Sequence, residues 1–321
     1  MPLATAVERV GGLQTQYAPT AYIGLWSRLD RFRRDDLTRA LERRTVVQGT
    51  LMRATIHIVS ARDYPLFVEA VRGTRREWWL SATRRRDQPH NLQAVAGRLR
   101  ALLADGPRRR EELIAHLGVD TTTWNGVQMW VDLVRAPPSG TWERRRADVF
   151  ALADHWLGRS SPVSERDAID HLVRRYLGAF GPASRKDVQS FTGLSAKALA
   201  SSFERLSLRR FRDEQGGELL DAQRAPLPDP ETEVPPRFLG PWEAALLVHA
   251  RRTQILPERH RSRVFHVKIP QSISTFLVDG RVAGAWTYEG GRVELEPFEK
   301  LPRQAKQDLD EEAERLSAFL A

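Results

Sequence analysis

The sequence predicts a mainly α-helical protein with short β wings, an α+β fold of three tandem winged-helix modules followed by a C-terminal β-meander domain. Two observations support this prediction. A helix–turn–helix segment occurs twice, because Gly106 and Gly118 recur as Gly181 and Gly193, 75 residues further on. Short β segments separated by glycine turns then follow a proline-rich stretch. A repeat at a fixed offset indicates duplication of one supersecondary unit.

The two repeats share the same start and stop signals. Residues 91–118 and 167–193 each contain an amphipathic helix that ends at Gly-Pro, then a basic pair and an acid, then a short apolar helix that ends at glycine. Glycine ends a helix and proline begins the next one, so both segments are predicted to be helix–turn–helix units. Ser184 and Asp187 have the spacing of a capping box at the start of the second short helix.

A third helix and a β wing are predicted to complete each repeat. The expected third helices are Thr122–Val131 and Ser195–Leu206. In the first repeat the expected wing strands are Asp132–Ala136 and a strand near Trp142, joined by a Pro-Pro-Ser-Gly turn. In the second they are Leu208–Phe211 and Glu218–Asp221, joined by Gly216-Gly217. Three helices closed by a two-stranded wing form the winged-helix pattern.

The N-terminal region predicts a third, divergent copy. Helices are expected over Thr20–Leu29 and Arg33–Arg43, followed by a hairpin over Thr45–Ser60 with Gly49-Thr50 near its turn. The second strand of this hairpin alternates, and strand side chains point to opposite faces in turn. We therefore expect one apolar face and one polar face, formed respectively by Met52, Ala54, Ile56 and Ile58, and by Arg53, Thr55, His57 and Val59.

The C-terminal part is predicted to be a separate β domain. Residues 225–241 are rich in proline and predict a linker or extended strap. A helix is expected over Trp242–Ala250, four strands over Val264–Ile269, Ser274–Val278, Ala283–Tyr288 and Arg292–Leu295, and a terminal helix over Pro302–Leu320. The predicted domains are residues 1–88, 89–163, 164–224 and 225–321.

The charge of the chain is concentrated in its first half. Residues 1–150 carry 25 arginines and no lysine against 16 acidic residues, which is the whole net charge of +9. Such asymmetry indicates a basic surface for a polyanion, most simply nucleic acid, although an arginine-biased solvated surface is the alternative. Candidates for sequence-neutral phosphate contacts are Arg108, Arg109, Arg110, Arg144, Arg145 and Arg146.

Several classes of protein are excluded or disfavoured. The chain has no cysteine, so disulfides, thiolate catalysis and cysteine metal sites are excluded. It has none of the common nucleotide-binding, zinc-protease or serine-hydrolase signatures, and its histidines lack the spacing of metal ligands. We therefore expect no cofactor and no metal. With neither a membrane span nor a signal peptide in the sequence, we expect a monomeric cytoplasmic protein that associates with the nucleoid.

Gln14-Thr15-Gln16 is the one candidate for chemistry that the residues themselves offer. On an extended segment two glutamines separated by one residue point the same way. An amide does not titrate usefully as a general base, but it can hold a water molecule by donating and accepting hydrogen bonds. The alternative is that these are ordinary polar residues before a helix.

Three segments together resemble the AlkZ-like family of bacterial DNA glycosylases. They are LQTQYAPTAYIGLWSRL, VVQGTLMRATIHIVSARDY and FLVDGRVAGAW. They match a Gln-x-Gln motif, an L-M-R-x-T-x-H hairpin and a D-G-x-x-x-G-x-W pattern. Glutamine at the second motif position places the chain with the AlkZ side rather than the YcaQ-related branch, which has Asp there. Thr15 departs from the aliphatic residue usual between the two glutamines.

The resemblance implies a function and a set of site residues. Gln14 and Gln16 would be the catalytic pair, and Arg53, Thr55 and His57 on the hairpin would contact DNA. The implied substrate is double-stranded DNA carrying cationic N7- or N3-alkylpurines, including bulky adducts or interstrand crosslinks. The alternative is a non-catalytic winged-helix DNA-binding protein such as a transcriptional regulator, because the fold alone does not specify the function.

Overall fold

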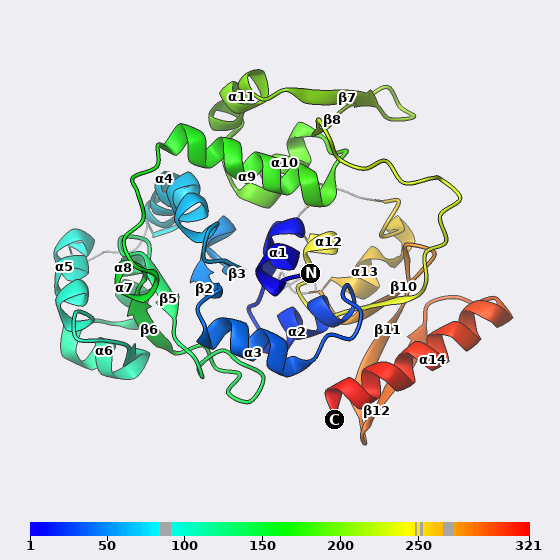
Figure 1. The fold of residues 1–321 in the computed structure, drawn as a ribbon, viewed down its shortest axis with the longest axis horizontal. Coiled ribbons are helices and arrows are strands. Elements are labelled where there is room, and N and C mark those ends of the chain that lie inside the picture. The colour runs from blue at the N-terminus through cyan, green and yellow to red at the C-terminus, as the bar shows by residue number, and fades with distance from the viewer. Residues whose placement is uncertain (84–90, 248, 251–252, 266–271) are drawn as a thin grey trace.

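The computed structural model describes residues 1–83, 91–247, 249–250, 253–265 and 272–321. Within these ranges one order of elements occurs three times: a helix, a short strand or bridge, two helices and two strands (Figure 1). The first copy is α1 (Leu3–Arg9), β1 (Leu13–Gln14), α2 (Ala18–Trp26), α3 (Arg34–Glu42), β2 (Val46–Thr50) and β3 (Ile56–Ser60). The second is α5 (Leu92–Leu102), β4 (Arg108–Arg109), α6 (Arg110–Leu117), α7 (Thr121–Val127), β5 (Leu133–Arg135) and β6 (Val149–Leu152). The third is α9 (Glu165–Phe180), a bridge at Ala183, α10 (Arg185–Thr192), α11 (Ala196–Arg205), β7 (Leu208–Arg212) and β8 (Glu218–Ala222).

The helix ends follow the local signals in the sequence. Gly118 and Gly193 close α6 and α10 in the left-handed conformation, with φ of 63° and 74°. Ser184 and Asp187 form the predicted capping box at the start of α10. These short-range predictions are confirmed because capping depends only on residues within one turn of the helix end.

The first two copies share one sheet. Its six antiparallel strands lie in the order β1-β3-β2-β5-β6-β4, whereas β7 and β8 form a separate two-stranded sheet. The expected strand near Trp142 is wrong, since the second strand of that wing is β6. Trp142 lies in the long connection between β5 and β6, where its ring packs on Tyr22 and Phe319 with centroid distances of 5.6 and 5.7 Å.

The expected polar face of the N-terminal hairpin is also wrong. Residues 52–54 form a 3₁₀ turn, and the strand begins only at Ile56. Both faces of β3 are covered by apolar clusters, and β1 and β2 pair with its two edges. Ile58 packs into one apolar cluster with Tyr22, and Val59 packs into another with Phe67. His57 is therefore buried, with 2% of its surface exposed.

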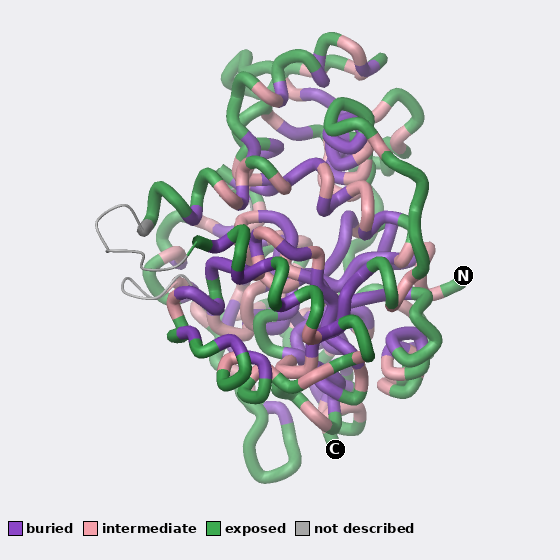
Figure 2. The backbone as a smooth tube through the Cα atoms, turned by 90° about the vertical axis from the view of Figure 1, so that its left-hand side faces the viewer, coloured by how far each residue is buried: buried purple, intermediate pink, exposed green. Residues whose placement is uncertain are grey.

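Helix α4 (Tyr64–Thr83) connects the first two copies, and the sequence analysis assigned it no structure. It packs along α9. The phenol of Tyr64 at its start donates a hydrogen bond of 3.0 Å to the carbonyl of Leu133 on β5. A short helix, α8 (Ala153–Leu157), follows β6. Figure 2 shows that the buried segments concentrate in the middle of the molecule.

The C-terminal region forms a four-stranded antiparallel sheet in the order β12-β11-β10-β9. Its strands are β9 (Arg237–Leu239), β10 (Thr275–Val278), β11 (Arg281–Glu289) and β12 (Arg292–Pro297). The helices are α12 (Ala244–Leu247), α13 (Arg261–Val264) and the terminal α14 (Arg303–Leu320), with a 3₁₀ turn at Glu258–His260. The last three predicted strands and the terminal helix are confirmed.

Two expectations for this region need correction. The sheet takes its edge strand β9 from the predicted linker, since Phe238 and Leu239 are apolar residues that pair with β10. The predicted strand at Val264–Ile269 begins with the last residue of α13, and most of it lies outside the described residues. The predicted helix at Trp242–Ala250 is reduced to α12, with residue 248 also outside the described residues.

Helix α14 closes the sheet and contacts the first copy. Leu309 and Leu316 pack in one apolar cluster with Phe276 and Trp286 of the sheet. Phe319 reaches the N-terminal elements, where its ring lies 5.9 Å from that of Trp26. No helix in the described part of the chain is both long enough and apolar enough to cross a membrane.

A buried ion network joins the first copy to the third. Asp63, just before α4, accepts hydrogen bonds from His171 at 2.8 Å and Arg175 at 2.9 Å on α9. Arg175 also lies 3.1 Å from Glu8 on α1. Burial alone would raise the pKa of Asp63, but the hydrogen bonds from His171 and Arg175 outweigh it and lower the pKa.

We expect Asp63→Asn to destabilise the protein by about 2 kcal/mol near neutral pH, because it removes the buried charge that accepts hydrogen bonds from His171 and Arg175, while Arg175 keeps Glu8 as a partner. The lowered pKa means that the Asp63 carboxylate stabilises the fold fully above its ordinary pKa of about 4. This contribution is lost as the pH falls through the folded-state pKa. Denaturant unfolding of both proteins at pH 7 and at decreasing pH measures the difference. A difference that does not shrink in acid would contradict this account.

Candidate active site

The two-residue strand β1 fixes the position of Gln14. It pairs antiparallel with β3, so that Leu13 lies opposite Ile58 and Gln14 opposite His57. The chain enters this strand through Gly12, whose φ is +85°, and a Cβ at Gly12 would lie 2.9 Å from Cγ1 of Val59. Only glycine fits such a positive φ and close approach. Gln14 is buried, with 7% of its surface exposed.

The side chain of Gln14 is oriented by Arg53. The Nη2 group of Arg53 donates a hydrogen bond of 2.8 Å to Oε1 of Gln14. Its Nη1 group donates to the carbonyl of Phe191 at the end of α10, and its guanidinium lies 5.7 Å from the centre of the Phe191 ring. Because guanidinium can only donate, it must face the carbonyl oxygen of the amide.

Gln16 is oriented in the same way by the backbone. Its Oε1 accepts a hydrogen bond of 2.7 Å from the N–H of Ile56. Gln16 itself is exposed. The N–H of Thr15 donates 2.8 Å to the carbonyl of Ile56. The Thr15 side chain is 2% exposed and its hydroxyl has no hydrogen-bond partner. That burial explains why an aliphatic residue suits this position.

His57 is neutral at physiological pH. Burial lowers its pKa to about 3, with the positive charge of Arg53 as a second cause. Its Nδ1 lies 3.0 Å from the carbonyl of Thr55, which requires a proton on Nδ1 and leaves Nε2 as an acceptor. The hydroxyl of Thr55 donates 3.1 Å to the carbonyl of Met52 and is used within the turn. Of the residues expected on the polar face, His57 is thus buried, whereas Arg53 and Thr55 are half-buried.

The loop between β5 and β6 reaches the same site. Arg145 donates a hydrogen bond of 2.8 Å to the phenol of Tyr17, directly after Gln16. Its guanidinium also lies 5.5 Å from the centre of the Trp142 ring. Its neighbours are paired with acids: Arg144 lies 3.5 Å from Asp148. Arg146 lies 3.1 Å from Glu111 and 3.5 Å from Asp148.

The other predicted arginines lie elsewhere. Arg108 and Arg109 form β4, which is at the opposite edge of the six-stranded sheet from β1. Five inter-strand steps of about 4.8 Å place them roughly 24 Å from Gln14. Arg108 donates 2.7 Å to the carbonyl of Leu102, Arg109 is exposed, and Arg110 begins α6. The structure therefore brings Arg145, but not Arg108, Arg109 or Arg110, to the glutamine pair.

Two residues of α10 and its cap belong to the site and were missed by the sequence analysis. Phe191 supplies a carbonyl and a ring to Arg53. A Cβ at Gly193 would lie 3.3 Å from Cγ of Arg53. The sequence marks Gly193 as a helix stop, but nothing local indicates that it faces a turn about 140 residues earlier.

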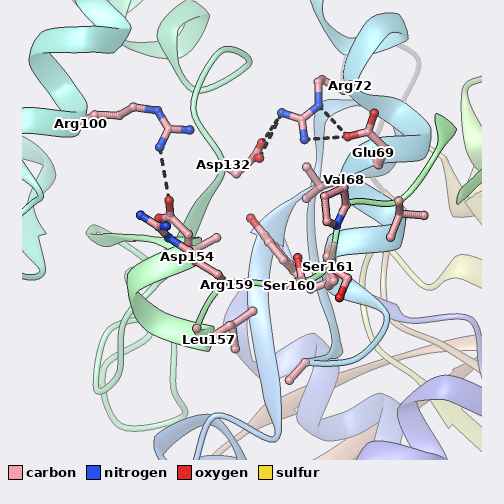
Figure 3. A pocket seen from close by; sticks show the side chains of 17 residues that line it. Val68, Glu69, Arg72, Arg100, Asp132, Asp154, Leu157, Arg159, Ser160 and Ser161 are labelled. Atoms are coloured by element: carbon pink, nitrogen blue, oxygen red, sulfur yellow. Dashed lines mark hydrogen bonds and ion pairs between the residues drawn. The ribbon is translucent and has the colours of Figure 1, made fainter.

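A separate cavity of about 300 Å³ lies between α4, α8 and the segment after α8 (Figure 3). Its charged groups neutralise one another: Arg72 lies 2.9 Å from Glu69 and 3.1 Å from Asp132, while Arg100 lies 3.6 Å from Asp154. None of the predicted site residues lines it. Within the described ranges, no three His, Asp or Glu side chains form a group able to hold a metal ion.

The comparisons with known proteins identify the class as the DNA glycosylases, enzymes that hydrolyse N-glycosyl bonds in DNA. The family described as "DNA glycosylase AlkZ-like" matches residues 7–319. The chain belongs to the AlkZ-like DNA glycosylase family. It is accordingly a DNA-repair hydrolase rather than a non-catalytic regulator.

A solved structure agrees with this assignment at the level of the fold. The chain is similar to the Streptomyces sahachiroi DNA glycosylase AlkZ, with a TM-score of 0.84 and 20% sequence identity. The match covers 99% of this chain and 91% of the other. No match was found among curated protein sequences.

We expect the imidazole of His57 to show no titration between pH 8 and pH 4.5, because its pKa of about 3 keeps it neutral. NMR signals of the His57 ring, assigned by their loss in His57→Gln, measure this directly, with free imidazole as the reference. An inflection near the ordinary histidine pKa of about 6.5 would contradict the burial of this group.

The same pKa gives a prediction for stability. The folded-state pKa is below the unfolded one, so neutral His57 stabilises the fold fully above about pH 6.5. This contribution decreases as the pH falls towards 3, by about 1.4 kcal/mol per pH unit. His57→Gln should lack that slope, which denaturant unfolding at several pH values would show.

Proposed function

We propose that this glycosylase releases cationic N7- and N3-alkylpurines from double-stranded DNA, with Gln14 and Gln16 as its catalytic residues. The observation that carries the proposal is the orientation of the two amides. Each Oε1 accepts a hydrogen bond from a group that can only donate, namely Arg53 for Gln14 and the N–H of Ile56 for Gln16. The three recurring units are proposed to be winged-helix modules of one monomer that binds DNA.

The chemistry of the substrate makes two uncharged amides sufficient. An alkylated purine carries a positive charge and departs as a neutral base, so no acid needs to protonate it. The enzyme must stabilise the oxocarbenium-like sugar and place a water molecule behind C1′. A carbonyl oxygen has two lone pairs, so each Oε1 retains one for the sugar or the water. Absence of a charged carboxylate at these two positions favours restriction to cationic leaving groups.

The position of the pair supports an approach to the lesion without deep base flipping. Gln14 lies on the edge strand β1, and Gln16 is exposed beside it. A crosslinked base cannot rotate freely out of the duplex into an enclosed pocket. The exposed Gln16 can instead meet the sugar at the protein surface, with the buried Gln14 two residues before it. We therefore include bulky adducts and interstrand crosslinks among the proposed substrates.

We expect Gln14→Ala and Gln16→Ala each to slow base release by about 10- to 1000-fold, since each removes one preorganised polar group. Single-turnover release of 7-methylguanine from methylated duplex DNA measures the chemical step. DNA affinity, measured by anisotropy, should change little, because amides add little to the phosphate interaction. The rate of the wild type should be nearly flat from about pH 6 to 8, as neither glutamine titrates.

Two outcomes would contradict the proposal. Full activity of the Gln14→Ala, Gln16→Ala double variant would remove the catalytic assignment. No release by the wild type from several N7- and N3-alkylated substrates would remove the substrate class.

The wing arginines give a separate prediction for binding. Replacing Arg144, Arg145 and Arg146 with Gln should flatten the dependence of DNA affinity on salt, which has a log–log slope of about −0.9 per neutralised phosphate. The slope should change by less than three phosphates, because Arg144 and Arg146 must first leave Asp148 and Glu111. Anisotropy titrations at several salt concentrations measure it. An unchanged slope would show that this loop does not contact phosphate.

A further inference from the structure

We propose that Arg53 is a positioning residue that holds the Gln14 amide in its reactive orientation. We propose also that the C-terminal end of α10 holds the Arg53 side chain in the position that this requires. The inference deepens the proposed function and rests on it for the role of Gln14. It differs from the expectation that Arg53 contacts DNA. It also assigns a part in catalysis to Phe191 and Gly193, which lie about 180 residues from the glutamine motif in the sequence.

The backbone at Arg53 is held in a conformation that it does not favour. Arg53 and Ala54 both have positive φ, of 53° and 56°, in succession. Each left-handed residue without glycine is unfavourable, and such conformations persist where the surroundings determine them. Here the hydrogen bonds of Arg53 to Gln14 and to the Phe191 carbonyl hold the backbone in this conformation.

Two of the five N–H donors of the guanidinium, one on each terminal nitrogen, are committed to acceptors inside the protein. Nη2 is bonded to Gln14 and Nη1 to Phe191, and one face packs near the Phe191 ring. Burial lowers the pKa of Arg53 to about 10, so it still carries its charge at neutral pH. A lysine cannot bridge both acceptors in this fixed geometry, because its single ammonium lacks the planar fork of arginine.

Gly193 gives Arg53 the space that it occupies. A Cβ at Gly193 would lie 3.3 Å from Cγ and 3.4 Å from N of Arg53. Gly118 provides a matched control, because it closes α6 as Gly193 closes α10. Both glycines are left-handed, with φ of +63° and +74°, but a Cβ at Gly118 would meet nothing within 4 Å.

The first experiment separates positioning from phosphate binding. Arg53→Lys should slow single-turnover release of 7-methylguanine by about 10-fold or more while DNA affinity and its salt slope stay unchanged. In the Gln14→Ala background, Arg53→Lys should have no further effect, because both variants remove one interaction. A normal rate with a reduced salt slope would overturn the proposal in favour of a phosphate contact, and additive losses would overturn it in favour of a general structural role.

The second experiment tests whether the C-terminal end of α10 holds Arg53 in position. Gly193→Ala and Gly118→Ala should lower the unfolding midpoint similarly, since both place alanine in a left-handed helix cap. Only Gly193→Ala should also slow base release, by about 10-fold. Equal rates in the two variants would overturn the role of Gly193.

A third measurement does not depend on turnover. The side-chain amide signals of Gln14, identified by their loss in Gln14→Ala, should be resolved from those of mobile glutamines in the wild type and in Gly118→Ala. They should move to the position of mobile side chains in Arg53→Lys and Gly193→Ala. Unmoved signals would overturn the proposal. A held amide in an enzyme that releases no alkylpurine would instead reject the proposed substrate and keep the positioning role.

Discussion

The pairing of β1 with β3 is the constraint on which the rest of the site depends. Only two residues of β1 pair with β3, yet this pairing fixes Gln14 opposite His57. It also places Gln16 where its side chain accepts a hydrogen bond from the N–H of Ile56. The pairing is possible because Gly12 turns sharply against Val59. It also pairs the second edge of β3, on which His57 is buried and neutral. The position of Gln14 and the contact of Gln16 with Ile56 thus follow from one short strand.

All three recurring units contribute to this site. The first supplies both glutamines and Arg53, the second supplies Arg145 beside Tyr17, and the third supplies Phe191. Buried charges on α1, before α4 and on α9 hold the first and third units together. The proposed site therefore depends on the packing of units that a repeat pattern alone would describe as independent.

The sequence predicted those features that local interactions determine. The helix caps at Ser184, Gly118 and Gly193 follow from a few neighbouring residues, and all are present. The residues offered the glutamine pair only as a weak candidate, since two glutamines have no spacing signal of their own, and the resemblance to a family decided in its favour. The burial of His57 was missed because alternation assumes one open face, whereas β3 lies inside a sheet covered on both sides. The left-handed turn at Arg53 contains no glycine and depends on contacts with α10, which no local pattern reveals.

The repeats place the proposed catalytic pair and two of the candidate phosphate-binding arginines at different edges of one sheet. Strands β1 and β4 have the same place in the order of elements of the first two units. Gln14 pairs with His57 on β3, and Arg109 pairs in the same way with Val149 on β6. Because the two units join through β2 and β5, these equivalent strands lie at opposite edges. In the proposed function the amides at one edge stabilise the developing sugar cation, and the arginines at the other are candidates for phosphate contacts. Arg53 is a cation beside the amides and would oppose the charge of the sugar, and the carbonyl dipoles of Gln14 and Phe191 that accept its hydrogen bonds offset part of that repulsion.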